Sequence, residues 1–272
     1  IDECQAPTVL CSHICINTLG SYRCRCYPNY VLDSDGRTCH ANGNPPDIWV
    51  ASKSHIASVK LEEKGPKLGR YLLTNLEFAL SMDYHFEKNV IVWSELQGIF
   101  ICEMSGSNNE LNASVCGRPL VTSDVEEPEG LAIDWIHDLL FWTDSNLTTI
   151  KVVNLFGEHY PKTLINTGLK APRAIVVHPV KGLMFWSDWK GNFIERASMD
   201  GTKRTLILKD SSLIFWPNGL AIDYIRDRLY IADAIRDHII NVDFDGNDPR
   251  IVIRQECENT YIPIFPIVFV LF

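Results

Sequence analysis

The chain has 272 residues, with 25 Lys and Arg against 34 Asp and Glu, so its formal net charge is −9 at pH 7. Its basic residues do not cluster, which argues against a nucleic-acid-binding surface, because such a surface makes many phosphate contacts. Most of the 9 cysteines lie within residues 4–39, a density typical of a disulfide-stapled module in an oxidising compartment. No signal peptide precedes Ile1, so we expect a mature or excised fragment of an extracellular or lumenal protein.

Residues 1–43 are expected to form a small first domain. The segment lacks long apolar runs and is too short to bury a sufficient core without staples. Its cysteines follow the spacing C-x6-C-x3-C-x8-C-x-C-x12-C, which by itself leaves the pairing open. The pattern resembles an epidermal-growth-factor-like (EGF-like) module, and this resemblance implies the disulfides Cys4–Cys15, Cys11–Cys24 and Cys26–Cys39.

The same segment resembles the calcium-binding subtype of this module, whose two half-motifs match "IDEC" and "CINTLGSYRC". Calcium takes about six to eight oxygen ligands, so carboxylate, amide and carbonyl groups must converge on it. The resemblance implies calcium as cofactor, held by side-chain oxygens of Glu3 and Asn17 and backbone carbonyls of Ile1, Thr18 and Ser21. The alternative is an acidic N-terminus and an Asx-rich turn that bind no ion.

A turn-rich linker, "HANGNPP" at 40–46, leads into the second expected domain, residues 44–255. This domain is a repeat with short apolar strands predicted at 78–83, 130–135, 174–179 and 219–224. Its aligned positions are Trp93, Trp142, Trp186 and Ile231, spaced by 49, 44 and 45 residues. The strand residues Asp83, Asp134, His178 and Asp223 precede them by 10, 8, 8 and 8 residues. The first repeat is therefore expected to carry a two-residue insertion.

Four short strands in each unit of about 45 residues are typical of a β-propeller blade. The motifs "VWSE", "FWTD", "FWSD" and "YIAD" resemble the YWTD repeats of the low-density lipoprotein receptor family, whose propellers have six blades. The expected fold is therefore mostly β. It consists of a disulfide-rich EGF-like module followed by an incomplete six-bladed YWTD β-propeller, with about four blades plus the closing strands.

The two ends of the expected propeller differ. Residues 47–61 resemble the opening strands that complete the last blade in the family, and four blades then extend to about Ile253. Two blades of the family pattern are not matched. Residues 256–272 are expected to form a divergent apolar tail, which Pro263 and Pro266 interrupt. A membrane-spanning helix needs about 20 apolar residues, so this tail is not expected to be one.

The repeated aromatic and acidic residues are assigned to structure. Trp93, Trp142 and Trp186 are expected to bury a large area between sheets. The aspartates Asp144, Asp188 and Asp233 are expected to accept backbone N–H groups from the next blade and so to tie the ring. Function is expected instead on unrepeated side chains of the top face of the propeller.

The second domain also carries candidate sites of covalent modification, namely disulfide formation and glycosylation. Cys102 and Cys116 flank a long connection, and we expect a disulfide between them, with two free thiols as the alternative; Cys257 has no evident partner. Asn112 ("NAS") and Asn146 ("NLT") are predicted glycosylation acceptors in surface turns.

Two histidines, His137 and His178, lie beside repeated strands. Histidine titrates near the pH of endosomes, so either residue could sense acid. The alternative is that both are ordinary solvated or core residues.

The resemblance implies a binding protein and not an enzyme. It implies the EGF-propeller unit of an endocytic lipoprotein- or vitellogenin-type receptor, at the cell surface and in endosomes, that supports acid-dependent ligand release and receptor recycling. The implied partners are lipoprotein-type or other protein ligands of the parent receptor, the cysteine-rich ligand-binding modules of the same receptor at acidic pH, and a propeller-specific endoplasmic-reticulum chaperone.

Three alternatives remain at this point: a nidogen-like extracellular matrix protein, a truncated soluble decoy isoform, and a calcium-dependent lactonase. The inner strands are mostly apolar and carry no evident catalytic cluster, which argues against the lactonase.

Overall fold

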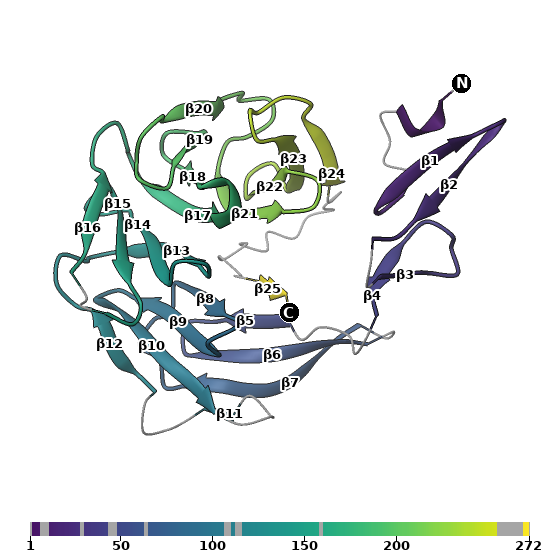
Figure 1. Cartoon of the computed structure of the whole chain (residues 1–272). Helices are drawn as coiled ribbons and strands as arrows, with labels where there is room; N and C mark the ends of the chain where they lie inside the picture. The colour runs from purple at the N-terminus through teal and green to yellow at the C-terminus, as the bar shows by residue number, and fades with distance from the viewer. Residues whose placement is uncertain are drawn as a thin grey trace. The chain divides into compact units, whose positions relative to one another are not determined.

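A computed structural model describes residues 2–5, 11–27, 30–42, 48–62, 65–105, 110–111, 116–157, 160–254 and 269–271. The chain divides into two compact units. The first unit contains residues up to 47 together with 60–67, and the second contains 48–59 together with 68–271. Figure 1 shows the strands of both units.

The first unit consists of short elements held by disulfides. A 3-10 turn, η1 (Glu3–Gln5), is followed by the hairpin β1 (Ile14–Thr18) and β2 (Ser21–Arg25) and by the hairpin β3 (Tyr30–Leu32) and β4 (Cys39–Ala41). Gly20 has φ +79° in the turn between β1 and β2, a conformation that glycine adopts without a steric penalty. The side chains of Leu19, Val31 and Leu32 are exposed, so apolar packing contributes little here.

The disulfides of this unit join Cys4 to Cys15, Cys11 to Cys24 and Cys26 to Cys39. The Cys11–Cys24 bridge is buried, with both residues no more than 5% exposed. In a module without a large core, such bridges stabilise the fold by restricting the unfolded chain.

The described residues of the second unit form five antiparallel sheets (Figure 1). One sheet holds β5 (Ile48–Ala51), β6 (His55–Glu62), β7 (Gly65–Thr74) and β25 (Phe269–Leu271). The other four are blades one to four, and each runs from its inner to its outer strand along the chain. Blade one has β8 (Ser81–His85), β9 (Val90–Glu95), β10 (Gly98–Ser105), β11 (Glu110–Leu111) and β12 (Arg118–Val121).

Blades two to four have four strands each. Blade two has β13 (Pro128–Asp134), β14 (Leu139–Asp144), β15 (Thr149–Asn154) and β16 (Lys162–Ile165). Blade three has β17 (Pro172–His178), the 3-10 turn η2 (Pro179–Lys181), β18 (Leu183–Asp188), β19 (Phe193–Ser198) and β20 (Thr205–Leu208). Blade four has β21 (Pro217–Asp223), β22 (Arg228–Asp233), β23 (His238–Asp243) and β24 (Arg250–Arg254). The architecture confirms the mostly-β prediction and gives a propeller of five blades.

Strand pairing corrects the predicted register of the first repeat. Trp93 pairs with Met82, as Trp142 pairs with Leu131 and Trp186 with Ile175. The inner strand of blade one therefore ends at His85, which takes the place of Asp134, His178 and Asp223, and the predicted two-residue insertion is wrong. The prediction failed because Asp83 was aligned with the aspartate that ends "AID" in blades two and four. In the structure the Asp83 carboxylate instead accepts a hydrogen bond from the N–H of Ile133 in the next blade (2.7 Å).

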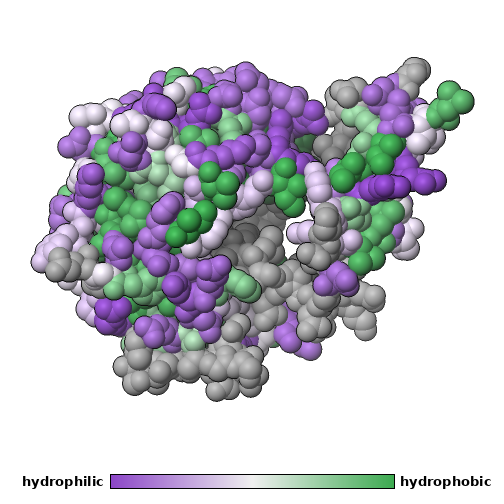
Figure 2. Space-filling model, in the orientation of Figure 1, coloured by the Kyte–Doolittle hydropathy of each residue, from purple (hydrophilic) through white to green (hydrophobic). Residues whose placement is uncertain are grey.

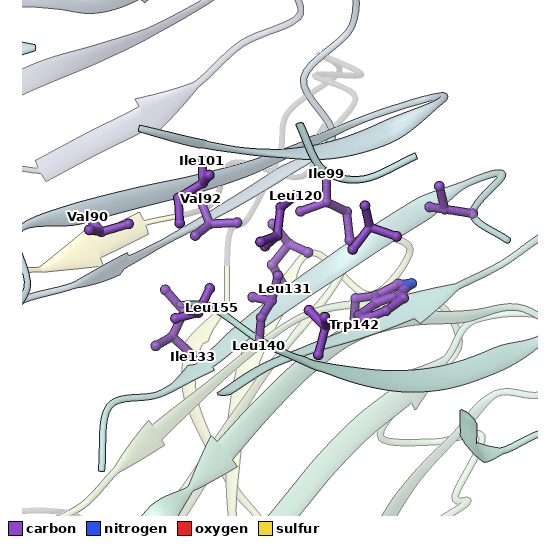
Figure 3. Close-up of a cluster of buried hydrophobic side chains, with 13 residues drawn as sticks. Val90, Val92, Ile99, Ile101, Leu120, Leu131, Ile133, Leu140, Trp142 and Leu155 are labelled. Atoms are coloured by element: carbon purple, nitrogen blue, oxygen red, sulfur yellow. The ribbon is translucent and has the colours of Figure 1, made fainter. Parts of the chain in front are cut away.

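The core consists of apolar clusters between successive blades. Figure 3 shows one of them, in which Val92 and Ile101 of blade one lie opposite Ile133 and Leu155 of blade two. Phe141 and Ile165 of blade two pack with Trp186 of blade three, and Phe185 and Leu208 of blade three pack with Ile231 of blade four. Trp142 and Trp186 are fully buried, so the structural assignment of these aromatic residues is consistent with their burial.

The divergent tail contributes one described strand. Phe269, Val270 and Leu271 of β25 pair with Val50, Trp49 and Ile48 of β5. The strand stands first in its sheet, beside β5, where β8, β13, β17 and β21 stand in theirs. The end of the chain thus completes the sheet that begins with β5.

Candidate functional site

The repeated aspartates anchor the loops that enter their own blades. Asp188 accepts hydrogen bonds from the N–H groups of Lys170 (2.6 Å) and Ala171 (3.1 Å), which lie on the loop arriving from blade two. It also accepts one from Gly191 (2.7 Å) in the following turn. Asp144 and Asp233 bind their loops in the same way. The predicted bond to the next blade is therefore corrected: each aspartate holds the connection from the preceding blade.

One end of the inner strands, which we call the start face, carries residues that differ from blade to blade. After the first proline of the inner strand stands Glu129 in blade two, Arg173 in blade three and Asn218 in blade four. The Glu129 side chain is 13% exposed and its Oε1 lies 3.9 Å from Nη1 of Arg173. Its Oε2 atom and the Arg173 Nε atom have no hydrogen-bond partner among the described residues.

Burial raises the pKa of Glu129 to about 7, although the Arg173 guanidinium opposes this shift. Glu127, Asp144 and Lys190 also act on this carboxyl group. A carboxyl group with such a pKa changes its charge near neutral pH, and a group with a perturbed pKa beside a charged partner is a candidate for ligand recognition.

Aromatic side chains also lie on the start face, directly after β18 and directly before β21. Trp189 and Trp216 meet edge to face, with ring centroids 5.5 Å apart, and Lys190 lies over the Trp189 ring at 5.1 Å. Phe215 and Trp216 are each 40% exposed. On the face drawn in Figure 2, hydrophobic residues lie in small groups among hydrophilic ones. The start face therefore offers aromatic surface beside a buried ion pair, a combination suited to a protein ligand.

Sequence reasoning predicted a site of unrepeated residues on one face but did not name these residues. A signal was present: the position after the strand-opening proline is Glu, Arg and Asn in "PEG", "PRA" and "PNG". On a repetitive scaffold, a position whose polar residue changes from repeat to repeat is a candidate for ligand binding.

At the other end of the inner strands, which we call the exit face, each strand ends in a residue that caps a turn. Asp134 accepts hydrogen bonds from the N–H groups of Ile136 and His137. In blade three the ring of His178 replaces the carboxylate, and its Nδ1 accepts from Lys181 N–H at 3.4 Å. His178 is buried and its Nε2 lies 3.8 Å from Asp227 of blade four.

His85 occupies the equivalent position in blade one and bonds Asp138 of blade two at 2.8 Å. His137 is an exposed side chain that pairs with Asp134 at 2.7 Å. Of the two histidines singled out in the sequence, His178 therefore lies in a blade interface and His137 lies on the surface, while His85 was missed.

The predicted calcium ligands lie around the first hairpin. Asn17, Thr18 and Ser21 belong to the ends of β1 and β2, and Thr18 Oγ1 donates to the Ser21 carbonyl (2.7 Å). The 3-10 turn containing Glu3 contacts both strands. Glu3 Oε2 is buried without a hydrogen-bond partner among the described residues. Ile1 lies outside the described residues.

An orphaned, buried carboxylate oxygen next to backbone carbonyls fits a hard cation such as calcium. A second grouping, His13 with Cys26 and Cys39, does not fit a metal, because both sulfur atoms are joined in a disulfide.

The remaining predicted sites are distributed over the second unit. A disulfide joins Cys102 in β10 to Cys116 ahead of β12. Asn146 lies in the exposed turn between β14 and β15, and its side-chain amide donates to Glu126. Asn112 and Cys257 lie outside the described residues.

Comparison with known proteins follows the two units. The calcium-binding EGF domain matches residues 1–39, and the low-density lipoprotein receptor repeat class B matches residues 138–179 and 182–224. The chain therefore carries a calcium-binding EGF domain followed by low-density lipoprotein receptor class B repeats. This confirms the resemblance predicted from the sequence.

Two relatives and one structure share these domains. The chain is 32% identical to the vitellogenin receptor Yl of Drosophila melanogaster over 96% of its own length and 13% of that protein. It is 30% identical to a human low-density lipoprotein receptor-related protein 5-like protein over 53% of its length and 56% of that protein. The crystal structure of a nidogen/laminin complex matches with a TM-score of 0.66 and 27% identity, over 76% of this chain and 78% of that one.

These matches are to a receptor, a receptor-related protein and a nidogen/laminin complex, and the chain spans only 13% and 56% of the lengths of the two relatives. No helix among the described residues has the length and apolar character that a membrane crossing requires.

Proposed function

We propose that this chain is the EGF-propeller portion of an endocytic lipoprotein- or vitellogenin-type receptor, and that it supports acid-dependent ligand release and receptor recycling. The observation that carries the proposal is the order of its domains, together with homology to a vitellogenin receptor over 96% of the chain. In this function the propeller binds proteins and catalyses no reaction. It acts outside the cell and in endosomes, and it folds with the help of a propeller-specific chaperone.

The start face supplies a physical basis for the acid dependence. Glu129 has a pKa raised to about 7 by burial, so it is partly charged at neutral pH and uncharged in an endosome. Its loop also carries Asp124, Glu126 and Glu127. Protonation removes one negative charge from this acidic cluster, which favours an acidic partner such as a cysteine-rich ligand-binding module as the pH falls.

Glu129→Gln tests this step. Binding of the full chain to a cysteine-rich module of a low-density lipoprotein receptor, measured by surface plasmon resonance near pH 7.5 and near pH 5.5 with calcium present, is expected to strengthen in acid. The variant, which is permanently uncharged, is expected to bind at neutral pH as the parent chain does in acid. Glu87→Gln, an exposed acidic residue on the exit face, is the control. Equal binding at both pH values would contradict the proposal.

We further propose that calcium binds the first unit through Glu3, Asn17, Thr18, Ser21 and Ile1. The ion would join the N-terminal turn to the β1–β2 hairpin and so stiffen the module. Calorimetric titration of the full chain with calcium is expected to show one site that Glu3→Gln weakens by about tenfold or more. The Asp35→Asn variant, in the turn between β3 and β4, is the control and is expected to bind calcium as the parent chain does. Unchanged calcium affinity in Glu3→Gln would contradict this ligand set.

A matrix protein is the second candidate, because the propeller matches a nidogen/laminin complex with a TM-score of 0.66. The two candidates differ in ligand. A truncated soluble decoy would keep the receptor's ligand. Binding to laminin, without binding to lipoprotein or to a receptor module, would favour the matrix protein over the receptor.

A further inference from the structure

The exit face holds a second cluster, distinct from the start face. Four turns follow the inner strands, and each exposes an apolar side chain: Phe86 and Val180 are each 74% exposed, Ile136 is 50% exposed and Ile225 is 49% exposed. Ile136, Val180 and Ile225 stand two residues after the end of the inner strand, and Phe86 stands one residue after it. Clustered exposed apolar residues rimmed by polar ones mark interaction sites more often than scattered ones do.

Two aromatic rings join these turns across the blades. Trp135 follows β13, Tyr224 follows β21, and their ring centroids lie 5.3 Å apart in an edge-to-face arrangement. The Tyr224 hydroxyl donates to the carbonyl of Val177 in β17 (2.9 Å). Trp135 is 36% exposed and Tyr224 is 46% exposed. The ends of three inner strands therefore meet at one half-exposed aromatic pair.

A carboxylate lies beside this pair. Asp83 of β8 accepts hydrogen bonds from the N–H groups of Tyr84 (2.7 Å) and Ile133 (2.7 Å), the latter two residues before Trp135. Burial raises the pKa of the Tyr224 hydroxyl, and the negative charge of Asp83 adds to this shift. Two main-chain donors leave the carboxylate with unused acceptor capacity.

The basic residues of the exit-face turns are already paired. Lys88 lies 3.9 Å from Asp138, Lys181 pairs with Asp227 (2.5 Å), and Arg226 pairs with Asp223 (3.0 Å). Asp83 has no cationic partner among the described residues. Besides the exposed Glu87, the face therefore holds one carboxylate without a cationic partner, Asp83, which bonds the strand that leads to Trp135.

We propose that the exit face binds a lysine or arginine side chain of a protein partner, with the cation held between the Asp83 carboxylate and the rings of Trp135 and Tyr224. A cation is attracted by aromatic faces and by a carboxylate, and both interactions strengthen where water is excluded. The residues that flank the cation in the partner are apolar and pack on Phe86, Ile136, Val180 and Ile225. A phospholipid surface fits less well, because the paired cations leave no excess positive charge to attract anionic headgroups.

The test uses the full chain and a fluorescent nonapeptide with one central lysine between leucines. Its affinity is measured by fluorescence anisotropy near pH 7.5, where Asp83 is ionised because its pKa, raised by burial, is about 6. A matched peptide has norleucine in place of lysine. The lysine peptide is expected to bind roughly tenfold or more tightly than the norleucine peptide.

Variants locate the interaction. Asp83→Asn keeps an oxygen that accepts from Ile133 and is expected to abolish the preference for lysine. Trp135→Leu, a change at a half-exposed site, is expected to weaken lysine binding several-fold. Asp200→Asn, in the exposed turn between β19 and β20, is the control and is expected to leave lysine binding unchanged. Circular dichroism establishes that each variant is folded.

Four results would overturn the proposal: equal binding of the two peptides, a lysine preference that survives in Asp83→Asn, displacement of the peptide by an equal concentration of butylammonium, or Asp83-independent binding to neutral phosphatidylcholine vesicles. The third result would mean that the apolar tips take no part, and the fourth that the face is a lipid surface. None of these experiments measures the acid-dependent binding assigned to Glu129. The lysine-binding proposal for the exit face can therefore fail without affecting the proposed function, and the reverse also holds.

Discussion

Blades two and three differ from blade four in how much of one corresponding face is buried. Ile165, Leu208 and Ile253 occupy the same place on the outer strands of the three blades, opposite Ile150, Ile194 and Ile239. Ile165 is 6% exposed and Leu208 is 7% exposed, but Ile253 is 56% exposed. The same place in the repeat, filled by an aliphatic residue in each blade, is therefore buried in two blades and exposed in the third.

The first and second strands of each blade show the same contrast. Ala132 is 4% exposed, whereas the equivalent residue of blade four, Ala221, is exposed. Phe141 and Phe185 are fully buried, whereas the equivalent Tyr230 is half-buried. In blades two and three these residues pack against the following blade. A residue of this propeller is thus buried when a following blade covers it, and its place in the repeat alone does not make it buried.

The largest effect is expected at the aromatic position. Phe185→Ala removes a fully buried ring between blades three and four, and we expect it to lower the free energy of unfolding by about 3–5 kcal/mol. Tyr230→Ala, at the equivalent position of blade four, is expected to cost about 1 kcal/mol. Urea denaturation followed by tryptophan fluorescence gives both values. Similar losses would show that blade four is covered as fully as blade three.

The outer-strand isoleucines give a smaller but cleaner comparison. Ile165→Ala is expected to cost about 2–4 kcal/mol, because the cavity lies in a packed cluster. Ile253→Ala makes the same chemical change at an exposed site and is expected to stay within about 0.5 kcal/mol of the parent. A large loss from the Ile253 change would contradict the exposure on which the comparison rests.

The aspartate of blade three is expected to rank next. Asp188→Ala leaves the N–H groups of Lys170, Ala171 and Gly191 without their acceptor, and we expect a loss of about 1–3 kcal/mol. Hydrogen exchange of these amides, read by mass spectrometry, should accelerate locally. Asp200→Ala, an exposed turn residue in the same blade, is the control. Slow exchange in Asp188→Ala would mean that the loop is held by other contacts.

Much of this arrangement could be predicted from the sequence. The cysteine spacing and the repeat of Trp142, Trp186 and Ile231 indicated a stapled module and propeller blades, because both patterns express local rules. The register of blade one could not be read, because Asp83 stands two residues before His85, and it is His85 that ends the inner strand as Asp134, His178 and Asp223 do in the other blades. The pairing of Trp135 with Tyr224 was also invisible, because it joins turns of two different blades.

The candidate site was harder to predict for the same reason. Glu129 and Arg173 are separated by a whole blade along the chain, and only the contact of β13 with β17 brings them together. Their burial, and the shift of the Glu129 pKa that it causes, depend on packing that no local pattern contains.

The smallest effect concerns the histidine between blades three and four. Burial and the nearby Lys181 lower the pKa of His178 from its model-compound value of 6.5, against the opposing effect of Asp227. A histidine whose pKa is lowered in the folded state binds fewer protons there than in the unfolded state. Its contribution to stability is therefore complete above pH 6.5, and it is lost as the pH falls below that value.

His178→Gln removes this titration. Its unfolding free energy, measured by urea denaturation from about pH 7.5 to pH 5, should fall less steeply than that of the parent chain, with a change smaller than that of Asp188→Ala. His137→Gln, at an exposed histidine, is the matched control and should follow the parent curve. If His178→Gln and the parent chain lost stability in parallel, acid would act on the propeller through other groups, and the blade three–four interface would be insensitive to endosomal pH through this residue.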